Sequence, residues 1–148
     1  MERKEVNLYI DTSIRGPKRK MGAYGYVLET QTAAGPATLT KVEKTECEST
    51  EHQSLCMALL KALKRIRTEC KLILYTDSEY IGAAFTKGWL TEWHQSGWNT
   101  KKGTPVANAE LWEPISETVQ RLEVQVKVKE EHSYKEWLRR EVEKEHIC

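Results

Sequence analysis

One short apolar run, Lys71-Leu72-Ile73-Leu74-Tyr75-Thr76-Asp77-Ser78, ends on an acidic side chain. A second run of the same kind, Val6-Asn7-Leu8-Tyr9-Ile10-Asp11, lies near the start of the chain. Both are typical of short strands. An ionised carboxylate at the mouth of a buried strand is poorly solvated, so a bound cation explains two of them better than packing does. Asp11 and Asp77 are therefore predicted to form a metal site.

Two further strands are predicted beside residues 6–11. The segment 22–28 follows a wide basic loop at 16–20, which indicates a hairpin. The Thr-rich segment 37–45 alternates weakly, and Gly35-Pro36 before it supplies a turn. Together these segments predict three antiparallel strands.

A helix is predicted between the third strand and residues 72–75. Ser49 or Thr50 can cap it, and its apolar positions recur at helical spacing through Leu55, Leu59, Ala62, Leu63 and Ile66. A helix and a strand after a three-stranded meander imply a crossover to a parallel partner. The sheet is therefore predicted to be mixed.

The second half of the chain predicts three more helices and a fifth strand. The alternation Val124-Gln125-Val126-Lys127-Val128-Lys129 gives a strand with one apolar face. Helical patterns cover 80–85 with a continuation through 89–93, then 107–119, and finally 134–145. We expect a single α/β domain over 1–148, in which helices flank a five-stranded mixed sheet.

Composition limits the possible classes of protein. The 148 residues carry a formal net charge of +1, so any phosphate-binding surface must come from local clusters of Lys and Arg. No apolar run approaches the roughly 20 residues that span a bilayer, and no signal peptide precedes the domain. Cys47, Cys56, Cys70 and Cys148 show neither a CxxC pair nor a spacing to histidine that suggests a zinc site. These features predict a cytoplasmic protein with reduced thiols and no membrane association. We expect a monomer, although the sequence carries no signal for oligomeric state.

Longer motifs give the chain a family resemblance. The stretch 74–80 reads Leu-Tyr-Thr-Asp-Ser-Glu-Tyr, 88–102 reads Gly-Trp-Leu-Thr-Glu-Trp-His-Gln-Ser-Gly-Trp-Asn-Thr-Lys-Lys, and 105–112 reads Pro-Val-Ala-Asn-Ala-Glu-Leu-Trp. With this spacing the chain resembles the bacterial-type (type 1) ribonuclease H family over nearly its whole length. The resemblance implies a ribonuclease H-like fold and a metal-dependent endonuclease that hydrolyses the RNA strand of RNA/DNA hybrids.

The resemblance also implies roles for individual residues. In the family's chemistry, two divalent ions held by carboxylates activate a water and stabilise the leaving oxygen. Mg²⁺ or Mn²⁺ would supply these ions, because both suit hard oxygen ligands. Asp11 and Asp77 would be metal ligands, and His132 would assist proton transfer or product release. Glu141 is the candidate for the last carboxylate, with Glu136 and Glu143 as alternatives.

One position departs from the family pattern. In the segment 50–56, Leu55 stands where the family has its metal-bridging glutamate, and it also fits the apolar stripe of the predicted helix. Glu51, one turn earlier, is the candidate substitute ligand, and Thr50 is a candidate substrate contact. Three hypotheses stay open: a weakened nuclease that prefers Mn²⁺, a hybrid-binding module without catalysis, and a nuclease that acts on double-stranded RNA or DNA.

A basic, Trp-rich segment is the candidate substrate-binding surface. Trp89, Trp98, Lys101 and Lys102 are predicted to contact the DNA strand by stacking and by phosphate contacts. Core packing of the tryptophans is the alternative, and Trp93 is placed to stack mainly on Trp89. The basic turn 18–20 is equally compatible with phosphate contact and with plain solvation.

Overall fold

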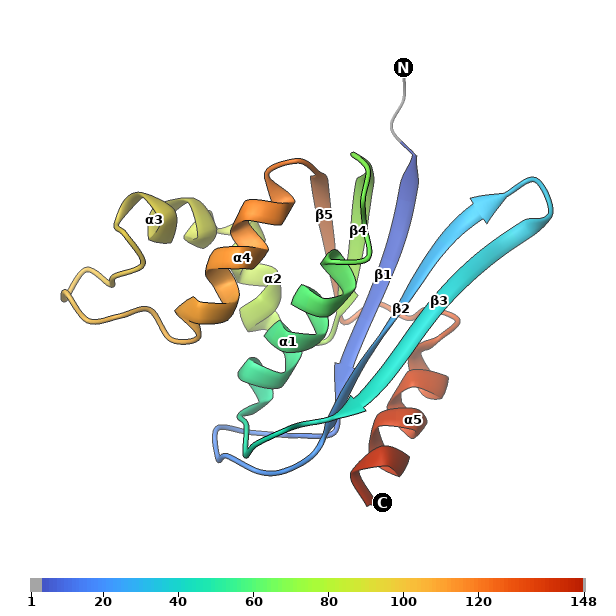
Figure 1. Ribbon diagram of the computed structural model, residues 1–148, viewed down its shortest axis with the longest axis horizontal. Coiled ribbons are helices and arrows are strands. Elements are labelled where there is room, and N and C mark those ends of the chain that lie inside the picture. The colour runs from blue at the N-terminus through green and yellow to red at the C-terminus, as the bar shows by residue number, and fades with distance from the viewer. Residues whose placement is uncertain (1–3, 148) are drawn as a thin grey trace.

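The computed structural model describes residues 4–147, so Cys148 lies outside the described residues. Its centre is one five-stranded sheet in the order β3-β2-β1-β4-β5 (Figure 1). The strands are β1 (Glu5–Thr12), β2 (Ala23–Thr32), β3 (Gly35–Lys44), β4 (Lys71–Thr76) and β5 (Glu123–Val128). β1, β2 and β3 pair antiparallel, whereas β4 pairs parallel with both β1 and β5. The predicted mixed sheet is confirmed.

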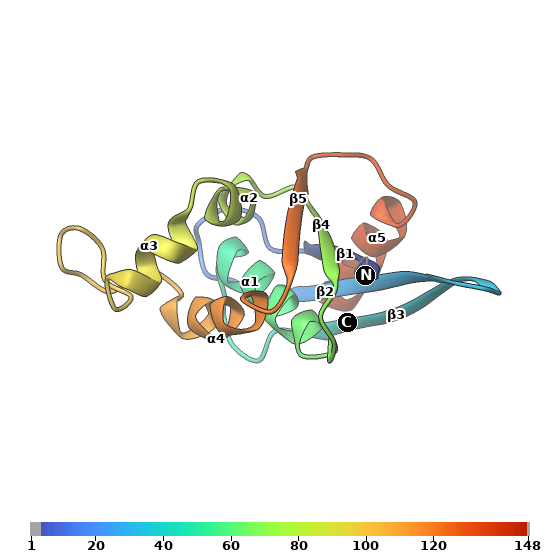
Figure 2. The same ribbon diagram turned by 90° about the horizontal axis from the view of Figure 1, so that it is seen from above.

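Helices cover both faces of this sheet (Figure 2). On one face, α1 (Glu51–Leu63) packs on β1 and β2, and α2 (Glu79–Thr86) packs on β4 and β5. Beside them, α4 (Ala109–Val119) packs against α1, and α3 (Trp89–Gln95) extends away from the sheet. On the other face, α5 (Lys135–Ile147) contacts β1, β2 and β3.

The pairing of β1 with β4 explains why the two aspartates meet. The strands run parallel with Tyr9 opposite Tyr75. Two residues further along, the same register sets Asp11 level with Asp77, which follows the last residue of β4. The carboxyl ends of these neighbouring strands therefore carry both side chains at one edge of the sheet.

Strand alternation decides which helix each side chain of β1 faces. Successive side chains of a strand point to opposite faces. Leu8 and Ile10 join the large core beneath α1, whereas Tyr9 joins the smaller cluster with Leu138 and Val142 of α5. Asp11 is two residues after Tyr9 on the same strand, so its side chain lies on the same face of the sheet and is directed toward α5.

The N-terminus of α1 is fixed by Thr50, whose side chain accepts a hydrogen bond from the backbone N–H of Gln53 at 3.0 Å. Of the two caps that the sequence allows, Thr50 is the one used. Leu55 is 4% exposed and lies in the large core. Its expected packing role is confirmed.

The helical segment after Asp77 differs from the prediction. A continuous piece was expected through Trp93, but α2 ends at Thr86 and α3 begins at Trp89. Gly88 lies between them with φ +74°, a left-handed conformation that glycine adopts without steric cost and that interrupts a right-handed helix. The break lets α3 turn outward from the sheet.

The remaining composition-based expectations concern cysteines and membranes. Cys47, Cys56 and Cys70 form no disulfide within residues 4–147. Burial raises the pKa of the Cys56 thiol, which keeps it protonated and unreactive. Over residues 4–147, no helix combines the length and apolar character needed to cross a bilayer.

Candidate functional site

Asp11 makes its main contact with an arginine that sequence reasoning missed. Arg139 of α5 donates from Nε to Oδ2 of Asp11 at 2.6 Å and from Nη2 to Oδ1 at 3.2 Å. The Asp11 side chain is only 14% exposed, so the pair is poorly screened by water. This hydrogen bond raises the pKa of Arg139 above its ordinary value, so the guanidinium is permanently charged.

Asp77 joins the same cluster. Its Oδ2 lies 3.7 Å from Nη2 of Arg139, and its Oδ1 lies 3.3 Å from Nζ of Lys135. Asp77 is not the cap of the following helix, because Ser78 takes that role by accepting from the backbone N–H of Ile81 at 3.1 Å. The side chain of Asp77 is thus available to the site, where two cations of α5 meet two strand-end carboxylates.

The structure does not gather the predicted set of metal-binding carboxylates. Glu51 turns away, since its Oε1 accepts a hydrogen bond from the backbone N–H of Gly16 at 2.8 Å. Leu55 offers no ligand and is held in the core. Among residues 4–147, no group of three or more His, Cys, Asp and Glu side chains could hold a metal ion.

Glu141 does not take the place that the resemblance implied, and Arg139 faces the aspartates instead. At about 100° per residue, Glu141 lies roughly 200° around the helix from Arg139. Leu138 and Val142 fix this orientation because both are buried against the sheet. The two alternative candidates, Glu136 and Glu143, are both exposed. The charge of Glu143 contributes to the raised pKa of Arg139.

His132 lies beside the aspartates, in an aromatic cluster. Its ring centroid is 4.3 Å from that of Tyr9 and 5.4 Å from that of Tyr75, and its Nδ1 accepts from the backbone N–H of Tyr134 at 3.2 Å. Burial lowers the pKa of His132, and the charge of Lys135 adds to this effect, whereas Asp77 opposes it. The ring is therefore held neutral, with its proton on Nε2. Its predicted part in proton transfer stays a prediction.

The predicted Trp-rich segment is partly core and partly surface. Trp89 and Trp93 contact each other with ring centroids 5.8 Å apart, and both pack against the large core. Lys87 lies over the Trp89 ring, with Nζ 5.9 Å from the centroid. Trp98 is half-buried, whereas Lys101 and Lys102 are exposed. The lysines are thus free to meet a polyanion, and the expected Trp89–Trp93 contact is confirmed.

Residues 97–105 form a latched loop, which we call the basic excursion. Trp98 has φ +67°, donates from its backbone N–H to Trp93 at 2.7 Å and accepts from Val106 at 2.9 Å. Across the loop, Thr100 donates to the carbonyl of Thr104 at 2.7 Å. These backbone hydrogen bonds give the excursion a defined shape at the far end of α3.

A hollow of about 580 Å³ lies beside the N-terminus of α1, next to the predicted substrate residue Thr50. His52 lines it and stacks on Tyr80, with ring centroids 3.9 Å apart and planes 7° apart. Arg19 of the basic turn also lines it and donates to Oε1 of Gln53 at 3.0 Å. Sequence reasoning missed Tyr80. Its ring stacks on His52, and its hydroxyl accepts a 2.9 Å hydrogen bond from Nε1 of Trp112.

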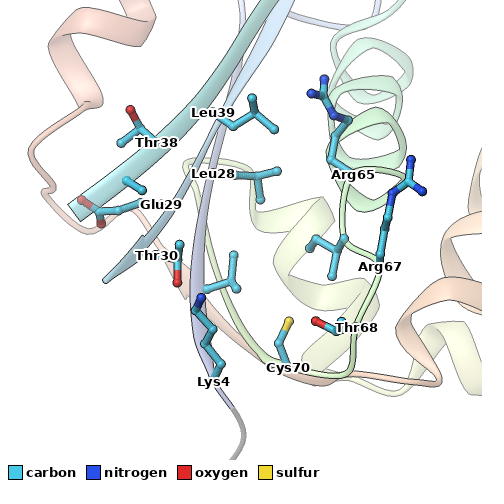
Figure 3. Close-up of a pocket in the computed structure, with 13 residues that line it drawn as sticks. Lys4, Leu28, Glu29, Thr30, Thr38, Leu39, Arg65, Arg67, Thr68 and Cys70 are labelled. Carbon is cyan, nitrogen blue, oxygen red and sulfur yellow. The ribbon is translucent and has the colours of Figure 1, made fainter. Parts of the chain in front are cut away.

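A second hollow, of about 290 Å³, lies at the opposite end of the sheet (Figure 3). Leu28, Leu39 and Cys70 line it, and Arg65 and Arg67 project along one side. It is formed where β1 begins, whereas Asp11 stands near the strand's other end. This hollow is thus separate from the candidate site, and none of the predicted site residues lines it.

The sheet order, the two strand-end aspartates and the single helix on the opposite face define a ribonuclease H-like protein. The solved structure of LC9-RNase H1, a type 1 RNase H with the type 2 active-site motif, superposes with a TM-score of 0.74 at 22% identity, covering 95% of this chain and 71% of that one. The family model RNase H matches residues 3–136. The chain therefore belongs to the ribonuclease H family, and the predicted family and fold are confirmed.

Two relatives show the extent of the similarity. A ribonuclease H of Clostridium botulinum is 32% identical over 129 residues, which cover 85% of this chain and 83% of that protein. A ribonuclease H of Thermus thermophilus is 41% identical over 70 residues, which cover 47% of this chain and only 42% of that protein. The match to the Thermus protein thus spans less than half of its length.

The divalent ions that the family implies do not fit the residues present. Mg²⁺ prefers hard oxygen ligands in octahedral geometry. Within residues 4–147 the inward-facing donors are Asp11 and Asp77, and side-chain cations approach all four of their carboxylate oxygens, while the exposed Glu131 is paired with Lys135 at 3.3 Å. The charge of these oxygens is already neutralised from within the chain.

Proposed function

We propose that this protein binds RNA/DNA hybrids through the ribonuclease H fold and does not hydrolyse their RNA strand. Membership of the family supports hybrid recognition. The observation that carries the loss of hydrolysis is the contact of the Arg139 guanidinium with both Asp11 and Asp77.

The chemistry explains why this contact matters. Hydrolysis with two metal ions needs carboxylates that bridge the ions and orient the attacking water. The position of the bridging glutamate holds the buried Leu55, and α5 presents a cation where a further ligand is needed. Each missing carboxylate removes both a ligand and a compensating charge.

The surface supports binding. Lys101 and Lys102 are exposed on the basic excursion, beside the half-buried Trp98. Exposed lysines bind a phosphate backbone mainly through release of counterions, which makes affinity depend on salt. The hollow beside the stacked rings of His52 and Tyr80 lies on the same side of the sheet as the basic excursion. His52 belongs to α1 and Tyr80 to α2, and both helices cover that face.

A second candidate function is a metal-dependent endonuclease that works with two carboxylates. The observation that favours it is the β1–β4 register, which sets Asp11 level with Asp77. In this case Mg²⁺ or Mn²⁺ would have to displace Arg139 and Lys135 when substrate binds.

A cleavage assay separates the two. A labelled RNA/DNA hybrid is incubated in Mg²⁺, and separately in Mn²⁺, with the wild type, Asp77→Asn and the double variant Leu55→Glu/Arg139→Asp. We expect the same background from the wild type and Asp77→Asn, and added cleavage from the double variant. Wild-type cleavage that disappears in Asp77→Asn would overturn the proposal in favour of the second candidate. Asp77→Asn also exposes a contaminating nuclease, because such an enzyme cleaves equally in both samples.

Binding is measured with the same substrates. Fluorescence anisotropy with a labelled hybrid, an RNA duplex and a DNA duplex of one sequence gives the three dissociation constants at one salt concentration. We expect the hybrid to bind most tightly. Tighter binding of either other duplex would assign the protein to that duplex instead.

A further inference from the structure

We propose that Arg139 and Lys135 are resident cations that take the place of divalent metal at Asp11 and Asp77, so that nucleic-acid binding by this protein is independent of metal ions. The statement about nucleic acid rests on the function proposed above. The statement about metal stands on the geometry of the site alone.

The two cations are delivered by one face of α5. Residues four positions apart on a helix are neighbours on its surface. Arg139 reaches Asp11 at 2.6 Å and Asp77 at 3.7 Å, while Lys135 reaches Asp77 at 3.3 Å. The spacing of the cations along the helix thus matches the spacing of the two carboxylates across neighbouring strands.

Both carboxylate oxygens of Asp11 already accept hydrogen bonds from within the chain. Oδ2 accepts from Arg139, and Oδ1 accepts from Arg139 at 3.2 Å and from the backbone N–H of Thr12 at 2.8 Å. Arg15 adds a further cation, with Nη2 3.6 Å from Oδ1. A metal ion would have to break these contacts and leave a half-buried guanidinium without its carboxylate, which is costly.

Packing holds Arg139 in place. Leu138 and Val142, on either side of it along α5, are 1% and 0% exposed and pack with Tyr9, Ala23 and Val27. Turning the helix to remove Arg139 from the site would expose these side chains to water. The arginine is therefore positioned by the core as well as by attraction to the aspartates.

Thermal unfolding and calorimetry with Mg²⁺ test the metal statement. The variant Arg139→Asp is compared with Arg140→Asp, which makes the same charge change at an exposed position of the same helix. The melting temperature is measured in EDTA and in millimolar Mg²⁺ at matched ionic strength. We expect no Mg²⁺-dependent shift and no saturable heat for the wild type and Arg140→Asp. Arg139→Asp should melt lower in EDTA and regain stability with Mg²⁺.

Two results would overturn this inference. One is saturable Mg²⁺ binding by the wild type. The other is an Arg139→Asp variant that responds to Mg²⁺ no more than Arg140→Asp does, because Arg139 would then not be what excludes the ion.

The second test asks whether binding of the RNA/DNA hybrid depends on Mg²⁺. The affinity in EDTA should be at least as high as in Mg²⁺ at matched ionic strength, because Mg²⁺ competes with the lysines for the phosphates and adds no bridging contact. Binding that requires Mg²⁺ would contradict the inference. A wild type that binds no hybrid under either condition would defeat the proposed function, while the calorimetric result would still decide the metal statement.

Discussion

The imidazole of His132 lies against the ring of Tyr9, with centroids 4.3 Å apart, and both rings stand beside the two aspartates. The contact joins the segment between β5 and α5 to the central strand of the sheet. Because the ring is half-buried, the contact favours the neutral imidazole, so the fold is coupled to pH.

We predict that stability falls as the pH drops through 6.5, the ordinary pKa of histidine. The folded-state pKa of His132 is lowered, so the unfolded chain binds more protons in this range and unfolding becomes easier. Denaturant unfolding between pH 7 and pH 5, about the range in which histidine titrates, measures the slope. His132→Gln should flatten it, whereas His94→Gln, at an exposed position, should not. Equal slopes in all three proteins would contradict the prediction.

Asp11→Asn should destabilise the protein by about 1–3 kcal/mol in EDTA, because Arg139 loses a charged partner at a poorly hydrated position. If Asp11 and Asp77 instead formed a metal site without its ion, Asp11→Asn would stabilise the protein, since removing one of two neighbouring carboxylates relieves their repulsion. Chemical denaturation measures the difference. Asp77→Asn should cost less, because the Asp77 side chain is 44% exposed against 14% for Asp11. A gain in stability from Asp11→Asn would argue for a vacant metal site.

Gly82→Ala should destabilise α2, although alanine is the better helix former by about 1 kcal/mol. A Cβ at this position would lie 2.5 Å from Cγ2 of Val128 on β5, and such overpacking costs about 1–3 kcal/mol. In a Val128→Ala background the same substitution should become neutral or stabilising. A double-mutant cycle on unfolding free energies measures this reversal, and purely additive effects would show that the contact is unimportant.

Lys101→Glu/Lys102→Glu should weaken hybrid binding and flatten its salt dependence, by about 0.9 in the logarithmic slope for each phosphate that the lysines no longer neutralise. Anisotropy titrations over a range of salt concentrations measure both effects. Lys64→Glu/Arg67→Glu makes the same charge change at exposed positions beyond the C-terminus of α1 and should leave the slope unaltered. If both double variants weaken binding equally, net charge alone would explain the effect.

The strand-end aspartates and the core helix could be predicted because each carries a strong local signal. Asp11 and Asp77 each close an apolar run, and parallel pairing brings such ends together. Leu55 repeats with Leu59 and Leu63 at helical spacing, so its burial follows from periodicity. In each case one short segment contains enough information to fix the outcome.

Arg139 was missed because α5 is rich in charges of both signs, and composition alone does not show which one faces the sheet. The useful signal was the buried pair Leu138 and Val142, four residues apart, which sets the inward face of the helix. With this face fixed, Arg139 and Lys135 point toward the aspartates and Glu141 does not. Glu141 lies nine residues after His132, but distance along the sequence does not determine which face of the helix a residue occupies.

The hydrogen bonds that latch the basic excursion have a consequence for binding thermodynamics. A loop that becomes ordered only when its ligand binds loses conformational entropy on binding, and this loss lowers the affinity. Here Trp98, Thr100 and Thr104 have their backbone partners before any ligand arrives. The excursion therefore meets a nucleic acid as a preorganised surface, and its association should carry a small entropic penalty and little change in chain order.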